Sequence, residues 1–90
     1  MSETKKLLKK HQQLNQLDMA KVTSHVQREK DGWVLNTIIL EGYNVPFQYT
    51  RRKAYKSLSG ARVNLTFYPV MKSIAGVDFE TMKVVRIRRS

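Results

Sequence analysis

Apolar and polar residues alternate with a period of two along much of this chain, and this alternation limits the folds that it can adopt. The clearest case runs from Ala61 to Tyr68, where Val63, Leu65 and Phe67 would all point to one side of an extended strand. Residues 33–40 are the most strongly strand-forming stretch. Because 90 residues suffice for only one core, the pattern predicts a single small β-rich domain.

Three further segments predict strands, which makes about five in sequence. A first strand begins near Ala20, a third runs from Val45 to about Arg52, and a fifth runs from Val77 to Ile87. In the first strand, alternation places Ala20, Val22, Ser24 and Val26 on the buried side and Lys21, Thr23, His25 and Gln27 on the other.

The segments between the strands carry turn signals. Lys30-Asp31-Gly32 predicts a hairpin turn between the first two strands, because Asp-Gly suits positive φ. Residues 53–60 have no clear period and end in Ser-Gly, which predicts a loop or one helical turn. Residues 69–76 are expected to connect the last two strands.

A helix is predicted at the N-terminus, over residues 2–17. Leu7, Leu14 and Leu17 recur at a spacing compatible with one helical face. Lysines four residues apart near the positive end of the helix dipole would destabilise it, so it would need docking or a polyanion. We therefore expect a basic N-terminal helix or arm over residues 1–18 and a β-rich core over residues 19–90.

These elements together predict an α+β fold that is mainly antiparallel β. An N-terminal helix would be followed by about five strands that form a twisted sheet or a small, partly open barrel. In strand count and size this arrangement resembles an OB-like or SH3-like barrel, and closure would hide sheet edges.

The charge of the chain indicates the kind of partner. With 17 basic and 7 acidic residues the formal net charge is +10, and residues 51–62 alone carry five cations and no acid. Absence of cysteine excludes disulfides, thiolate metal sites and a catalytic thiol. The longest apolar run near the N-terminus is Leu7–Leu8, too short for a signal core, so we expect a cytoplasmic protein without a membrane partner.

Cations and tyrosines in and around the basic segment are candidates for nucleic-acid binding. Cations would contact phosphates and aromatic rings would stack on bases. The expected phosphate contacts are Arg51, Arg52, Lys53, Lys56 and Arg62, and the expected stacking residues are Tyr49, Tyr55 and Tyr68. Arg86 and Arg88, on one face of the final strand, would contact the same phosphate backbone.

A structural explanation competes with each of these assignments. Phe47, Tyr49 and Trp33 could be core residues and the basic run a solvated loop. Arg86 and Arg88 could protect an edge strand from aggregation.

The favoured function is that of a small nucleic-acid-binding protein, with RNA or a ribonucleoprotein preferred to DNA as the ligand. The alternative is an adaptor module whose basic surface binds an acidic protein partner. In either case we expect a monomer. An enzyme is not predicted, and neither is a metal or a cofactor. His11 and His25 lack the spacing of a metal-binding pair, and Asp78 and Glu80 fit a solvent-facing strand.

Overall fold

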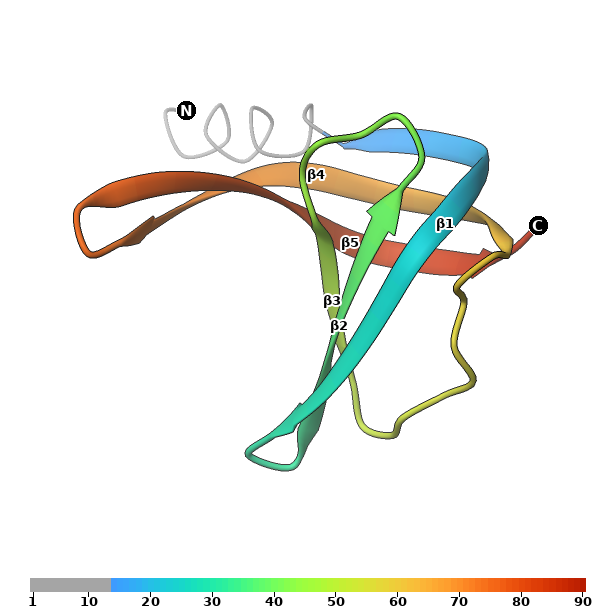
Figure 1. Cartoon of the computed structure of the whole chain (residues 1–90), viewed down its shortest axis with the longest axis horizontal. Helices are drawn as coiled ribbons and strands as arrows, with labels where there is room; N and C mark the ends of the chain where they lie inside the picture. Colours follow the sequence, from blue (N-terminus) through green and yellow to red (C-terminus); the bar gives the residue numbers. More distant parts are fainter. Residues whose placement is uncertain (1–13) are drawn as a thin grey trace, which may run out of the picture.

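A computed structural model of the chain describes residues 14–90, and it shows five strands that close into a ring (Figure 1). The strands are β1 (Asn15–Lys30), β2 (Trp33–Leu40), β3 (Phe47–Arg51), β4 (Arg62–Ile74) and β5 (Val77–Arg89). Their order around the ring is β1-β2-β3-β5-β4, and β4 pairs back onto β1. Every pairing is antiparallel except that of β3 with β5, so the sheet is mixed.

The predicted N-terminal helix is wrong where the structure describes it. Asn15, Gln16 and Leu17 begin β1 and pair with β4, with Leu17 opposite Leu65. Leu17 packs against the core of the ring, and this burial outweighs the helix-compatible leucine spacing. Residues 2–13 of the predicted helix lie outside the described residues. Within residues 14–90 there is no helix, so this part of the chain is all-β where α+β was expected.

The predicted connection over residues 69–76 is also wrong for most of its length. β4 continues to Ile74, and the turn to β5 consists of Ala75 and Gly76 alone, with φ angles of 51° and 80°. Pro69 lies beyond Phe67, the last residue of β4 that pairs with β1, and at this point β4 pairs with β5. Proline is tolerated there because one side of the strand no longer needs its N–H for a ladder. The two strands form a long hairpin that projects from the ring (Figure 1).

The first hairpin is confirmed, but one irregularity in β1 changes which residues face inward. Val22 pairs with Leu40 and Ser24 with Ile39, so Thr23 is an extra residue in the ladder, a β-bulge. The Thr23 hydroxyl donates to the Ile39 carbonyl at 3.1 Å. Because a slip of one residue moves side chains to the other face, the predicted alternation holds at Val22 and is reversed beyond the bulge.

The reversal is visible in the burial of β1. Val26, predicted to be buried, is 45% exposed, whereas His25 and Gln27 are partly buried. Their partners on β2 confirm the new face, since His25 lies opposite the buried Ile38 and Gln27 opposite the buried Asn36.

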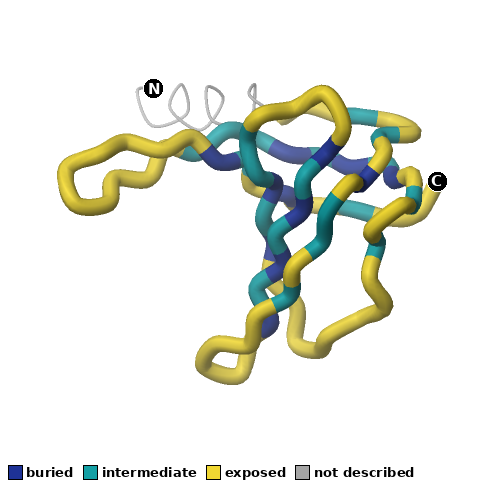
Figure 2. Tube along the Cα trace, viewed as in Figure 1, coloured by how far each residue is buried: buried dark blue, intermediate teal, exposed yellow. Residues whose placement is uncertain are grey.

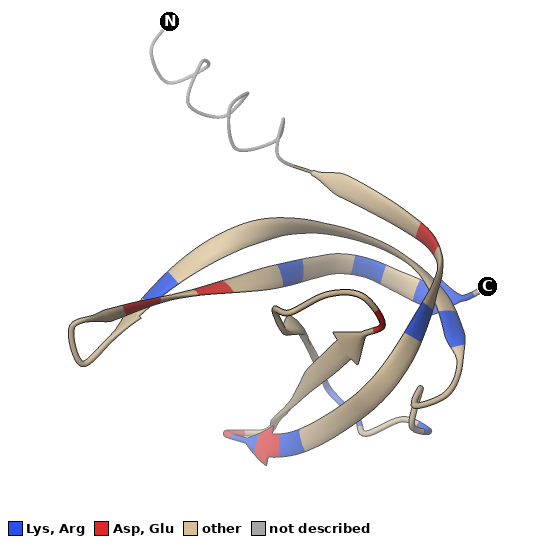
Figure 3. Cartoon of the chain, turned by 45° about the horizontal axis from the view of Figure 1, so that its top comes forward, with Lys and Arg blue, Asp and Glu red and all other residues tan. Residues whose placement is uncertain are grey.

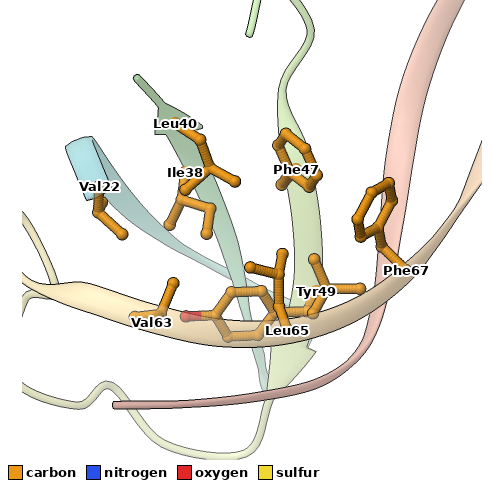
Figure 4. Packing of buried hydrophobic residues seen from close by; sticks show 9 residues of the cluster. Val22, Ile38, Leu40, Phe47, Tyr49, Val63, Leu65 and Phe67 are labelled. Atoms are coloured by element: carbon orange, nitrogen blue, oxygen red, sulfur yellow. The ribbon is translucent and has the colours of Figure 1, made fainter. Parts of the chain in front are cut away.

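Nine apolar side chains from all five strands form the core (Figure 4). The predicted inward face of β4 is confirmed, since Val63, Leu65 and Phe67 are all buried. Phe47 is fully buried, and its ring meets that of Phe67 edge to face at 4.9 Å between centroids. Burial is concentrated where the strands converge, and both hairpin tips and the β3–β4 loop are exposed (Figure 2).

We expect Phe47→Ala to destabilise the fold by about 3–5 kcal/mol, because it removes a buried ring and leaves a cavity. Met71→Ala, at an exposed position in the projecting hairpin, should change stability by no more than about 0.5 kcal/mol. Urea unfolding followed by circular dichroism measures both variants. Equal effects would show that the core is not organised around Phe47.

Candidate functional site

The ring is closed between β3 and β5 by a very short pairing. Phe47 pairs with Met82 and Gln48 with Lys83, and the Met82 amide donates to the Pro46 carbonyl at 2.9 Å. Beyond these pairs the two strands separate. The space between them measures about 280 Å³ and is lined by Tyr49–Arg51 on one side and Lys83–Ile87 on the other. Basic side chains therefore stand on both walls of this opening.

The loop between β3 and β4, residues 52–61, is fastened to β1 by two side chains. The Gln27 amide makes two hydrogen bonds with the Tyr55 backbone, donating to its carbonyl at 2.6 Å and accepting from its N–H at 3.0 Å. The His25 Nδ1 atom accepts from the Leu58 N–H at 2.8 Å. Both side chains point toward the loop only because the bulge at Thr23 turned them to this face.

His25 is in turn oriented by Asn36. The His25 Nε2 atom lies 2.8 Å from the Asn36 Oδ1 atom, and the buried Asn36 amide also donates to the Val34 carbonyl at 3.2 Å. Since Nδ1 accepts a hydrogen bond, Nε2 must carry the proton and donate, so these contacts require the neutral imidazole. This histidine is a structural clamp between β2 and the loop.

A groove of about 320 Å³ lies between the clamped loop and the strands; we call it the basic groove. Its lining residues are His25, Asn36, Tyr49, Arg51, Tyr55, Lys56, Leu58, Ile87 and Arg88. Three of them are cations, and none of the lining residues within 14–90 is acidic. The Arg51 guanidinium carbon lies 5.4 Å from the Tyr49 ring centroid and 6.0 Å from that of Tyr55, within the range of cation–π attraction.

The two tyrosines of the basic groove differ in exposure. Tyr55 is 61% exposed, so a face of its ring is open to a ligand. Tyr49 is 8% exposed and belongs to the core, where burial raises the pKa of its hydroxyl above the usual value despite a smaller opposing effect of the nearby Arg51. No described residue hydrogen-bonds that hydroxyl, and no described side chain holds a fully buried polar atom without a partner. Tyr49 also lines the basic groove.

The structure gathers several of the residues that the sequence suggested. Tyr49, Arg51, Tyr55, Lys56 and Arg88 all line the basic groove. Arg86 lines the adjoining space between β3 and β5, together with Arg51. Tyr68 lies one strand further, paired with Lys83 across β4 and β5, and is partly buried. Basic residues follow the C-terminal half of β5 and acidic ones its hairpin half (Figure 3).

Three predicted phosphate contacts lie elsewhere. Arg52 stacks over the Trp33 ring at 4.4 Å, and Trp33 is absent from the lining of the basic groove. Lys53 is exposed in the loop and does not line the groove. Arg62 donates from Nη1 to the Met19 carbonyl at 2.9 Å, where β1 adopts a φ of 58°, so it supports an irregular part of the backbone.

Sequence reasoning missed the position of Trp33. The suggestion that Phe47 and Tyr49 are core residues is confirmed, but Trp33 is 44% exposed. It is the first residue of β2, directly after the tight turn at Asp31 and Gly32, where the hairpin has left the core. The adjacent turn signal could have indicated this position. His25 and Gln27 were missed for a different reason, because nothing in the sequence marks the bulge.

Comparisons of the chain with protein-family models, with curated proteins and with solved structures found no match. Among residues 14–90, no group of three or more His, Asp and Glu side chains could hold a metal ion. The same part of the chain contains no helix long and apolar enough to cross a membrane. Asp78 accepts a hydrogen bond from the Ser73 hydroxyl at 2.9 Å within the projecting hairpin.

Replacing His25 with Ala should loosen the loop while the ring stays folded. It removes one hydrogen bond to the loop, worth about 1 kcal/mol, so exchange of the Leu58 amide should quicken roughly five-fold. Val26→Ala, on the neighbouring solvent-facing position, is the control. Hydrogen exchange followed by NMR measures both, and equal protection of Leu58 in the two variants would refute the clamp.

Proposed function

We propose that the protein binds single-stranded nucleic acid in the basic groove, with RNA preferred to DNA. The observation that supports this is the meeting of three cations and one open aromatic ring in a single groove. Arg51, Lys56 and Arg88 come from β3, the loop and β5, and Tyr55 presents its ring beside them. Phosphates pair with cations and bases stack on aromatic faces, so each part of the groove has a counterpart in a nucleotide chain.

The size and shape of the site favour a single strand. A groove of about 320 Å³ has room for a base and its phosphate, within the range of roughly 300–1,000 Å³ for small-ligand pockets. The described residues include no helix that could enter a major groove. RNA is the first choice because sequence recognition of RNA commonly uses unstacked bases that stack on aromatic side chains, and Tyr55 offers such an open ring.

We also propose that the closed ring is a small OB-like barrel. Five strands closed by a short parallel pairing between β3 and β5 agree with such a form. OB-like folds bind oligonucleotides and oligosaccharides, so the likeness of fold leaves the ligand open. The side chains of the basic groove, and not the fold, therefore favour nucleic acid.

Removing the groove cations should weaken binding and reduce its dependence on salt. For single strands, each phosphate contact contributes about 0.7 to the slope of log affinity against log salt. Replacing Arg51, Lys56 and Arg88 together with Ala should therefore lower the slope by about 2. Fluorescence anisotropy of labelled single-stranded RNA, single-stranded DNA and duplex DNA at several salt concentrations measures this.

The control for that experiment replaces Lys21, Lys53 and Arg89 with Ala, which removes the same charge from exposed positions outside the basic groove. Equal losses in the two variants would show that overall charge, and not the groove, binds the ligand. Absence of binding to every oligonucleotide at low salt would refute the proposal and favour the acidic protein partner.

Tyr55 should contribute by stacking. Tyr55→Ala should weaken binding by about 1–3 kcal/mol, and Tyr55→Phe should retain most of the affinity because the ring face is preserved. Tyr43→Ala removes another exposed tyrosine, which is absent from the groove lining, and serves as control. The same anisotropy titration measures all three, and an unchanged affinity for Tyr55→Ala would remove this residue from the site.

A further inference from the structure

The outer face of β1, β2 and β3 carries a second set of aromatic and basic residues. Residues that pair across neighbouring strands point to the same face of the sheet, so each set of paired residues forms a row across the strands. In the row at the hairpin tip, Lys30 pairs with Trp33, and Arg52 lies over the Trp33 ring from the end of β3. In the next row, Arg28 pairs with Leu35, which pairs with Thr50. The bulge at Thr23 is what places Arg28 and Lys30 on this face.

Trp33 is held in an orientation that leaves ring surface free. The Arg52 guanidinium carbon sits 4.4 Å from the ring centroid, and the side chain is still 44% exposed. Beside the ring lies a hollow of about 390 Å³ lined by Lys30, Asp31, Trp33, Leu35 and Thr50. An exposed tryptophan next to a hollow is a surface that a flat ring can cover.

The charge on this face suits a polyanion. Arg28, Lys30 and Arg52 surround the aromatic and apolar residues, and Asp31, in the turn, is the acidic residue that lines the hollow. Glu29 pairs with the buried Val34 and so belongs to the opposite face of the sheet. A fourth cation comes from the projecting hairpin, where Lys72 donates to the Gln48 side chain of β3 at 2.9 Å.

We propose that this outer face is a second contact surface for single-stranded nucleic acid, with one base stacked on Trp33 and the adjoining phosphates on Lys30, Arg28 and Arg52. The choice of nucleic acid as the ligand rests on the proposed function of the basic groove. Arg51 and Arg52 are consecutive and serve opposite faces of the sheet, Arg51 lining the groove and Arg52 covering Trp33. One strand that passes around the end of β3 contacts both surfaces.

Trp33 is the only tryptophan in the chain, so its emission reports directly on this surface. Labelled oligouridylate is titrated with the full chain while anisotropy of the label and tryptophan emission are recorded together. We expect quenching of Trp33 that follows the same binding curve as the anisotropy. Trp33→Ala should weaken binding about 5- to 140-fold, whereas Trp33→Phe should retain most of the affinity.

The outcomes separate this inference from the function on which it rests. A rise in anisotropy without quenching, together with unchanged affinity of Trp33→Ala, would overturn the second surface and leave binding in the basic groove intact. No rise in anisotropy would overturn both. Equal quenching by polyglutamate would overturn nucleic acid as the occupant and indicate an acidic protein. Circular dichroism of Trp33→Ala establishes that the variant folds, as expected for an exposed position.

Discussion

The β-bulge at Thr23 is the feature on which both candidate surfaces depend. One extra residue in β1 reverses the alternation of every side chain between the bulge and the hairpin turn. His25 and Gln27 are thereby turned toward the β3–β4 loop and hold it by three hydrogen bonds. The same reversal places Arg28 and Lys30 beside Trp33. Without the bulge, these cations would lie on the inner face and the loop would lose its clamp.

The short closure between β3 and β5 supplies the second constraint. Only two residue pairs join β3 and β5, so an opening remains between the two strands beyond these pairs. Basic side chains of both strands line this opening. Arg51, Lys83 and Arg86 all line that opening, and none of the described residues in its lining is acidic. Like charges held close together repel, and a bound polyanion relieves the repulsion. This repulsion is one reason for proposing an anionic ligand.

The local pattern predicted the hairpin at Asp31-Gly32 and the inward face of Val63, Leu65 and Phe67, because turn chemistry and alternation act over a few residues. Leu17 was misassigned to a helix, since packing against β4 overrides leucine spacing. Arg51, Tyr55 and Lys56, which line one groove, could be suggested as candidates together because they lie close in the sequence. Their tethers, His25 and Gln27, could not be found, because a bulge depends on how β1 passes from β4 to β2. Arg62 carries the same charge as Arg51 but serves the backbone at Met19.

The most direct test of the account is to map the binding surface residue by residue. Amide and indole resonances of the full chain are followed by two-dimensional NMR during titration with a short single-stranded RNA. Binding at the two surfaces should shift the amide resonances of Arg51, Tyr55, Lys56 and Arg88 and the Trp33 indole resonance, on the two sides of β3. Shifts confined to the projecting hairpin around Ala75, or spread evenly over all basic residues, would contradict it.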